Sequence, residues 1–296
     1  MSLPLWIANI PSDVPILIAG PTASGKSTLA LSIAERRGGY ILNADALQVY
    51  ENWRILTARP NPKEETSVPH RLYGHVDGTK DYSVGRWLRD IKPYLGNGHR
   101  PIIVGGTGLY FKALTSGLAD IPPTPPNVRA KATEKLKTEG LAALIADLNY
   151  ETQARLDLQN PMRVQRAWEV FASTQRSIVQ WQKETPPPLL RLGNCSTILF
   201  DADKDWLNKR IKTRFNKMVI SGALEEAQKN LKHWNPIAQS AKAIGAKELI
   251  SYLAGDLTFE EAKQIATITT RQFAKRQRSW FRSNMKNWRS VDPRDL

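Results

Sequence analysis

Residues 16–27 read Ile-Leu-Ile-Ala-Gly-Pro-Thr-Ala-Ser-Gly-Lys-Ser, a short apolar run followed by a glycine-rich turn. The turn fits the phosphate-binding pattern Gly-x-x-x-x-Gly-Lys-Ser/Thr at every fixed position. The apolar run is typical of a buried strand, and residues 27–36 have the amphipathic spacing of a helix. Strand, turn and helix in this order are the context in which the pattern binds phosphate. The plain alternative is a glycine-rich turn beside a surface lysine.

Each fixed residue of this turn has a part in binding an anion. The glycines let backbone N–H groups converge on phosphate oxygens, and the dipole of the following helix adds positive potential. Lys26 supplies a positive charge, and the Ser27 hydroxyl is a ligand for Mg²⁺, the cofactor that we expect. The predicted phosphate-binding residues are Gly20, Pro21, Thr22, Ala23, Ser24, Gly25, Lys26 and Ser27.

Further strands and helices alternate along the chain. Strands are expected at 40–43, 101–104 and 196–200, and a helix capped by Ser83 is expected to run towards Leu95. Two proline-rich segments, 121–126 and 185–188, bound a stretch of helical composition. We therefore predict an α/β fold, a P-loop NTPase-like parallel sheet flanked by helices, with an inserted all-helical subdomain. The expected core domain comprises residues 1–116 and 195–296, and the insertion domain comprises residues 117–194.

The charge of the chain favours a polyanionic partner. Its 296 residues include 42 Lys and Arg against 28 Asp and Glu, a net charge of +14. In residues 206–296 there are 18 Lys and Arg against eight Asp and Glu, so most of the excess lies in the last third. A nucleic acid is the expected partner, and a solubilising surface is the alternative.

The single cysteine and the lack of long apolar runs indicate in which cellular compartment the protein is expected. Cys195 cannot form an intrachain disulfide, and no Cys/His cluster has the spacing of a zinc site. No segment has the length of a membrane span, and the N-terminus lacks the pattern of a signal peptide. We expect a cytoplasmic protein without a membrane partner.

Four cations near the C-terminus are spaced four, three and four residues apart, so they share one face of a helix. They are Arg271, Lys275, Arg278 and Arg282. Three aromatic residues, Phe273, Trp280 and Phe281, fall on a neighbouring face. Such a helix can pack through its aromatics and present its cations to RNA phosphates. The alternative is a solvated cationic face above core aromatics.

A metal-holding aspartate is not found at the strand end where nucleotide-hydrolysing P-loop enzymes need it. The most apolar strand, 101–104, is followed by Gly-Gly-Thr. Asp45 instead lies two residues past the strand 40–43, at the edge of the sheet where ligands of α/β folds bind. Asp45 either positions an acceptor there or caps the turn before Leu47.

Six segments together resemble the bacterial tRNA dimethylallyltransferases, also called tRNA isopentenyltransferases, over nearly the whole chain. They are Gly20–Ser27, Asn43–Tyr50, Val104–Tyr110, Arg214–Met218, Ala243–Gly245 and Thr270–Gln277. The resemblance implies transfer of a dimethylallyl group from dimethylallyl diphosphate to N6 of adenosine 37, next to the tRNA anticodon. The products would be N6-isopentenyladenosine and diphosphate. The turn 20–27 would then bind the diphosphate that leaves, and a metal-holding aspartate would not be needed.

The resemblance also implies the roles of single residues. The catalytic residues would be Asp45, Arg214, Lys26 and Thr107. Asp45 would accept a proton from N6, Lys26 and Arg214 would stabilise the leaving diphosphate, and Thr107 would position the substrates. The plain alternative for Thr107 is a turn that caps the helix through Tyr110. The implied tRNA-binding residues are Asp45, Ala46, Leu47, Gln48 and Thr107 on the base side, Arg129, Met162, Arg163, Val164, Gln165 and Arg166 in the insertion, and Arg271, Lys275, Arg278 and Arg282 on the basic helix. Residues 54–60 depart from the family pattern, so no contact is assigned within 54–80.

Three other functions compete with this interpretation. One is a P-loop kinase in which Asp45 orients the hydroxyl of a small acceptor. Another is a non-catalytic RNA-binding protein that uses the P-loop to sense a ligand. The third is an isopentenyltransferase for free adenylate. The insertion and the cationic helix argue against the two small-molecule enzymes, since a small acceptor needs neither. We expect a monomer whose partners are tRNA and dimethylallyl diphosphate.

Overall fold

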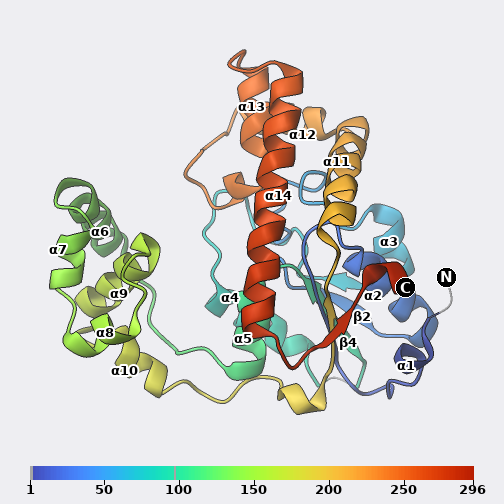
Figure 1. Cartoon of the computed structure of the whole chain (residues 1–296), viewed down its shortest axis with the longest axis horizontal. Coiled ribbons are helices and arrows are strands. Elements are labelled where there is room, and N and C mark those ends of the chain that lie inside the picture. Colours follow the sequence, from blue (N-terminus) through green and yellow to red (C-terminus); the bar gives the residue numbers. More distant parts are fainter. Residues whose placement is uncertain (1–2, 97) are drawn as a thin grey trace. The chain divides into compact units, whose positions relative to one another are not determined.

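The computed structural model describes residues 3–96 and 98–296, which form two compact units (Figure 1). The first unit comprises the chain up to Thr115 and again from Leu189 to Leu296, and the second comprises Ser116–Pro188. Within the described residues, the first unit contains a six-stranded parallel sheet of order β3-β2-β4-β1-β5-β6. Its strands are β1 (Ile16–Ala19), β2 (Tyr40–Asn43), β3 (His70–Arg71), β4 (Pro101–Gly105), β5 (Ser196–Phe200) and β6 (Arg289–Val291). The predicted α/β fold with a parallel sheet is confirmed.

The central strands of this sheet are buried on both faces, as expected of a parallel sheet covered by helices. Ile16 and Ile18 pack on the face covered by α1 (Leu5–Ala8) and α2 (Lys26–Arg37), and Leu17 packs on the face covered by α4 (Val84–Ile91) and α5 (Gly108–Ser116). The strands at 16–19, 40–43 and 196–200 begin and end where the sequence predicted, and β4 is one residue longer.

The helix after Ser83 is shorter than predicted. The Ser83 hydroxyl accepts a hydrogen bond from the backbone N–H of Arg86, so Ser83 is the N-cap of α4. The α-helix ends at Ile91, and a 3₁₀ turn, η1 (Lys92–Tyr94), follows. Pro93 has no N–H to donate to the helix, which accounts for the early end.

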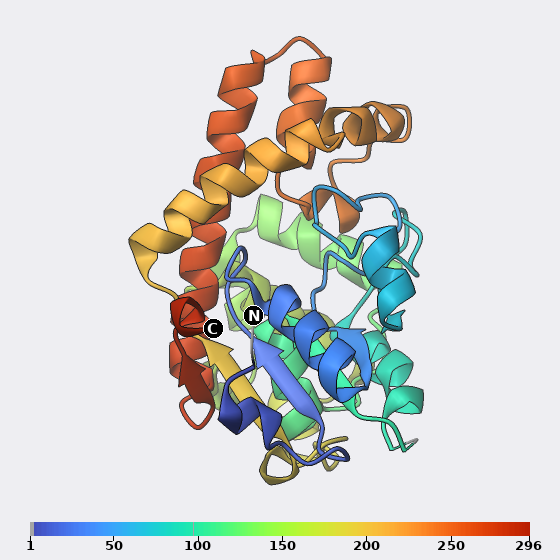
Figure 2. The ribbon, with the colours of Figure 1, turned by 90° about the vertical axis from the view of Figure 1, so that its right-hand side faces the viewer.

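Three further helices of the first unit, and the first half of a fourth, stand above the carboxyl edge of the sheet (Figure 2). They are α11 (Lys204–Ile220), α12 (Ala223–Leu231), α13 (Ala246–Leu253) and α14 (Phe259–Asn284). They share a core that includes Phe215 and Leu249, and Trp53 and Leu56 from the loop after β2 pack into it. The carboxylate of Glu226 on α12 accepts hydrogen bonds of 2.6–2.9 Å from the N–H groups of residues 54, 55 and 56. This loop, which continues into α3 (Pro62–Ser67), is thus held against the four helices.

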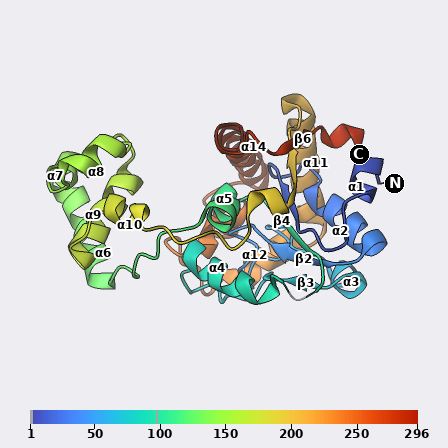
Figure 3. The same ribbon diagram turned by 90° about the horizontal axis from the view of Figure 1, so that it is seen from below.

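The second unit is helical throughout its regular structure (Figure 3). Its helices are α6 (Pro126–Thr138), α7 (Leu141–Ala146), α8 (Tyr150–Arg155), α9 (Pro161–Thr174) and α10 (Ile178–Lys183). Leu144, Val164 and Trp168 lie in a core of its own. The expected insertion ran to residue 194, whereas this unit ends at Pro188. Residues 189–194 belong to the first unit, where Leu190 and Leu192 pack against the core below α5.

None of the described helices combines the length and the apolar character that crossing a membrane requires.

Candidate active site

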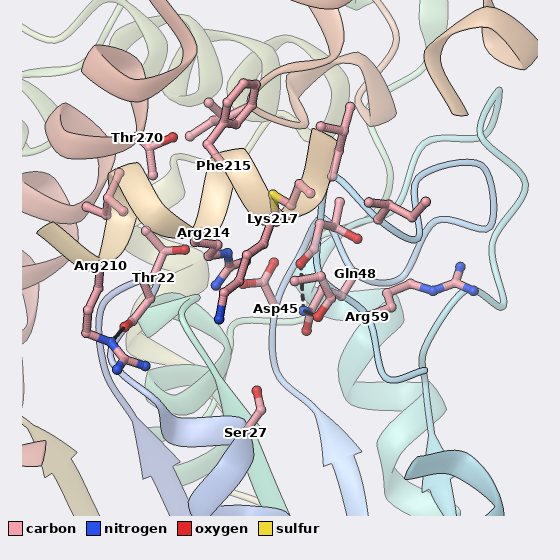
Figure 4. A pocket seen from close by; sticks show the side chains of 18 of the residues that line it. Thr22, Ser27, Asp45, Gln48, Arg59, Arg210, Arg214, Phe215, Lys217 and Thr270 are labelled. Atoms are coloured by element: carbon pink, nitrogen blue, oxygen red, sulfur yellow. Dashed lines mark hydrogen bonds between the residues drawn. The ribbon is translucent and has the colours of Figure 1, made fainter. Parts of the chain in front are cut away.

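A cavity of about 880 Å³ opens at the carboxyl ends of β1, β2 and β4 (Figure 4). Its volume is in the range of about 300–1,000 Å³ that is usual for small-molecule sites. Its walls come from the P-loop, the turn after β2, the loop 54–62, and one face each of α11 and α14. All these elements belong to the first unit.

The P-loop, residues 20–27, takes the left-handed backbone conformation at one glycine and at one alanine. Gly25 has φ +97° and Ala23 has φ +63°, and α2 begins directly after Gly25. Arg210 on α11 donates from Nε to the carbonyl of Ala23 at 2.8 Å, and Lys26 donates from Nζ to the carbonyl of Pro21 at 3.1 Å. Both bonds hold the loop in its curled shape.

The structure divides the eight predicted phosphate-binding residues into two groups. Thr22, Ala23, Gly25, Lys26 and Ser27 line the cavity. Gly20, Pro21 and Ser24 are buried and lie outside its wall. A Cβ at Gly20 would lie 2.8 Å from Cβ of Phe200, so this glycine lets β5 approach the loop.

Asp45 is held at the cavity by the turn that follows β2. The buried side chain of Asn43 accepts a hydrogen bond from the N–H of Asp45 at 2.8 Å and donates to its carbonyl at 2.9 Å. Oδ1 of Asp45 accepts from the N–H of Leu47 at 3.0 Å. Asp45 therefore caps this turn and also lines the cavity, so the two alternatives for this residue are compatible.

Thr107 supports the turn that contains Asp45. Its Oγ1 accepts from the N–H of Ala46 at 2.9 Å, and its own N–H donates to the carbonyl of Ala44 at 3.2 Å. Its carbonyl accepts from the N–H of Tyr110 at the start of α5. Leu47 and Gln48 line the cavity, whereas Thr107 and Ala46 do not. The contact of Thr107 with substrate stays a prediction.

Lys26, Asp45 and Arg214 form a group of interacting charges in the cavity. Burial lowers the pKa of Lys26 to about 8; the negative charge of Asp45 opposes this shift, and the positive charge of Arg214 adds to it. Burial also lowers the pKa of Arg214, again against the effect of Asp45. Figure 4 shows the Arg214 and Asp45 side chains pointing towards one another. Two cations and one carboxylate thus share a space that can hold an anion and a proton donor.

The lowered pKa of Lys26 predicts how anion binding depends on pH. The protonated amine attracts phosphate, so the affinity of the free protein for an organic diphosphate should be constant between pH 7 and pH 8 and fall about tenfold per pH unit above pH 8. Titration calorimetry between pH 7 and 9.5 measures this, and proton uptake on binding should appear at pH 9. In Lys26→Arg the guanidinium stays protonated, so the fall should vanish. A wild-type affinity that is flat to pH 9.5 contradicts the prediction.

The residues present fit a magnesium ion that is bound mainly through a substrate. Among residues 3–96 and 98–296, no group of three His, Cys, Asp or Glu side chains is placed to hold a metal. The Ser27 hydroxyl is exposed at the cavity in the first turn of α2. Mg²⁺ commonly takes one or two protein ligands and completes its shell with phosphate oxygens and water.

The C-terminal helix contributes to the cavity and to the core. Thr270 and Phe273 line the cavity, and Phe281 is buried below α5. Trp280 lies so close to Gly108 that a Cβ there would be 2.1 Å from the indole ring. The predicted packing of the helix through its aromatic residues is confirmed for Trp280 and Phe281.

The four predicted cations of this helix differ in exposure. Arg271, Lys275 and Arg282 are exposed, and Arg282 lies 3.6 Å from the carboxylate of Asp201. Arg278 is half-buried, and its Nε is buried without a hydrogen-bond partner among the described residues.

In the second unit, the predicted RNA-binding residues lie on α6 and α9. Met162 is 73% exposed, and Arg163 is exposed beside Asp157. Gln165 and Arg166 are half-buried and bind side chains of their own unit, and Arg129 lies on α6. Val164 is fully buried in the core of the unit. The prediction that Val164 contacts RNA is therefore wrong, because its side chain has no accessible surface.

Sequence reasoning missed one wall of the cavity. Residues Arg54–Arg59, Asn61 and Pro62 line it, although no contact was assigned in this segment. Leu56 faces Phe215 and Met218 there, so this wall is apolar between cationic ends. The resemblance of residues 54–60 to the family pattern could have indicated this wall. No contact was assigned there because several residues of the segment differ from that pattern.

A P-loop that faces a carboxylate and an arginine across one cavity, with an apolar wall beside them, is typical of an enzyme that binds a phosphorylated compound. The chain belongs to the IPP transferase family, whose family model matches residues 48–284. A second family model, isopentenyl transferase, matches residues 15–78.

Similar proteins support this assignment along nearly the whole chain. A protein named tRNA dimethylallyltransferase from a Ruegeria species is 55% identical over 98% of this chain and 99% of its own. One of the same name from Cereibacter sphaeroides is 54% identical over 96% of this chain and 91% of its own. The crystal structure of the full-length tRNA isopentenylpyrophosphate transferase from Bacillus halodurans is 31% identical, with a TM-score of 0.66 over 95% of this chain and 90% of its own.

Proposed function

We propose that this protein transfers the dimethylallyl group of dimethylallyl diphosphate to N6 of adenosine 37 in tRNA, and that it does so as a cytoplasmic monomer. The observation that carries the proposal is the placement of Lys26, Arg214 and Asp45 around one cavity beside the P-loop. The names of the similar proteins support tRNA and the dimethylallyl group as substrates.

Both reacting groups need catalytic assistance. The N6 lone pair of adenine is delocalised into the ring, which makes N6 a weak nucleophile. As the lone pair forms the new C–N bond at C1 of the donor, the C1–O bond breaks and diphosphate leaves with the electron pair. Asp45 accepts the proton that N6 loses, and general-base catalysis of this kind typically contributes about 10²–10⁴-fold.

The cations stabilise the charge that develops on the leaving group. Lys26 and the N–H groups of the P-loop would bind the diphosphate, and Arg214, which lines the same cavity, would stabilise the negative charge that grows as the C1–O bond breaks. Bound Mg²⁺, held at Ser27, would supply further positive charge to the phosphate oxygens. These contacts are stronger in the transition state than with the intact donor, so they increase turnover. The apolar wall of Leu56, Phe215 and Met218 suits the five-carbon group.

The tRNA surface is proposed to include the cations of α14 and the exposed residues of the second unit. The target base must leave its stack to reach Asp45, at a cost of about a few kcal/mol that contacts with the protein offset. Asp45, Leu47 and Gln48 lie on the cavity wall where the base would enter. The cations of α14 would bind the RNA backbone.

Replacing Arg278 by alanine should weaken tRNA binding and leave the chemical step intact. The slope of log K against log salt concentration should become less steep by about one, because the variant loses one phosphate contact and so releases about one counterion fewer on binding. Binding titrations at several salt concentrations, beside single-turnover rates at saturating tRNA, measure both effects. Lys286→Ala, an exposed cation just beyond α14, is the control. An unchanged salt slope with a slow chemical step would contradict the assignment.

Nucleoside mass spectrometry tests the proposed activity. tRNA that lacks the modification is incubated with purified protein, Mg²⁺ and dimethylallyl diphosphate, and a parallel sample receives ATP instead. We expect a five-carbon mass increase on adenosine only with the diphosphate donor. No increase with a tRNA preparation that a related enzyme modifies would overturn the proposal and favour the kinase alternative.

A further inference from the structure

Gln277 on α14 is a buried polar residue that bridges two loops of the site. It is 6% exposed. Its Oε1 accepts a hydrogen bond from the N–H of Thr22 in the P-loop at 2.8 Å, and its Nε2 donates to the carbonyl of Gly106 at 2.9 Å. Thr22 offers a donor and Gly106 offers an acceptor, so only one orientation of the carboxamide satisfies both. The two loops come from the ends of adjacent strands, β1 and β4.

The Gly106 end of this bridge adjoins Asp45. A Cβ at Gly106 would lie 2.4 Å from Nε2 of Gln277 and 3.3 Å from Oδ2 of Asp45. The next residue, Thr107, binds the backbone of Ala44 and Ala46 on either side of Asp45. The carboxamide thus connects the loop that holds Lys26 to the turn that supports Asp45.

We propose that Gln277 is a positioning residue that sets the distance between the leaving-group site and the proton acceptor. This inference rests on the proposed function. Gln277 touches neither reacting atom, and it uses the N–H of Thr22, so the diphosphate is bound by other N–H groups of the P-loop. A small misplacement of reacting groups is enough for a large loss of rate, about 100-fold for 1 Å.

Gln277→Glu changes only one end of the bridge. An ionised carboxylate still accepts from Thr22 but cannot donate to Gly106, and its oxygen repels the Gly106 carbonyl. A protonated carboxyl group restores the donor. We expect kcat about 10- to 100-fold below wild type at pH 8, and a ratio of variant to wild type that rises as the pH falls towards 6. Burial favours this behaviour, because it raises the pKa of a carboxyl group.

Gln272→Glu is the matched control, since it makes the same change on the exposed side of the same helix. Its kcat at saturating tRNA should equal that of wild type at every pH. Gln277→Met keeps the length of the side chain and removes both hydrogen bonds. It should lose turnover at all pH values without recovery, and bind inorganic diphosphate more weakly while tRNA affinity holds.

The results separate this inference from the proposed function. An inactive wild-type protein would overturn the function, whereas diphosphate binding by Gln277→Met would still report on the bridge. Wild-type kcat for Gln277→Met would overturn the positioning role. So would unchanged diphosphate affinity in that variant, or a loss of kcat in Gln277→Glu that does not change between pH 6 and 8. Thermal unfolding of each variant confirms that the folded protein is compared.

Discussion

Replacing Asp45 by asparagine is expected to slow single-turnover prenyl transfer by about 10²–10⁴-fold, with tRNA affinity unchanged. The asparagine oxygen can still accept the hydrogen bond that Oδ1 of Asp45 accepts from Leu47, so the turn is kept. The amide cannot take the N6 proton. The variant therefore separates the base from its structural role, which Asp45→Ala does not.

Rapid-quench measurement at saturating donor and tRNA gives the rate of the chemical step, and a binding titration gives the tRNA affinity. Asp256→Asn, in the exposed loop between α13 and α14, is the control for the substitution itself. If Asp45→Asn retained turnover near that of wild type, Asp45 would not be the base.

Arg214→Ala is expected to lower turnover by about 10²–10³-fold, since it removes a cation that is proposed to stabilise the leaving group. Arg214 lies on the cavity wall with Asp45 and Lys26 near it. Removing it should also raise the pKa of Lys26, because its positive charge contributes to lowering that value. The fall in diphosphate affinity at high pH should therefore begin at a higher pH in this variant.

The measurements are single-turnover rates and the pH dependence of diphosphate binding. Lys212→Ala removes an exposed cation of the same helix outside the cavity and should change neither. A loss of tRNA affinity in Arg214→Ala at an unchanged chemical rate would place Arg214 in the RNA surface.

Local patterns in the sequence predicted the centre of the fold well. The apolar runs at 16–19 and 40–43 are buried throughout, and the run at 196–200 is buried from Ile198 onwards, as expected of strands that lie between helices. The edge strands β3 and β6 were not predicted, because they are two and three residues long and partly exposed. Their pairing with a neighbouring strand, not their composition, makes them strands.

The site was predictable where a single segment supplies the chemistry. The P-loop pattern located Lys26 and Ser27, and the strand end located Asp45. Gln277 was not found, because a glutamine within a cationic helix has the pattern of an exposed residue. Val164 was assigned to RNA by resemblance, although its spacing from Ala167 and Trp168 is that of a buried helix face.

The most direct test of the central claim is to count the phosphate products of one reaction. The P-loop is proposed to release diphosphate, and not to hydrolyse a nucleotide. With unmodified tRNA and dimethylallyl diphosphate, we expect one diphosphate for each isopentenyladenosine formed, without ATP and without orthophosphate. Orthophosphate release from ATP as a condition of the reaction, or diphosphate release without a modified adenosine, would contradict the proposed role of the P-loop.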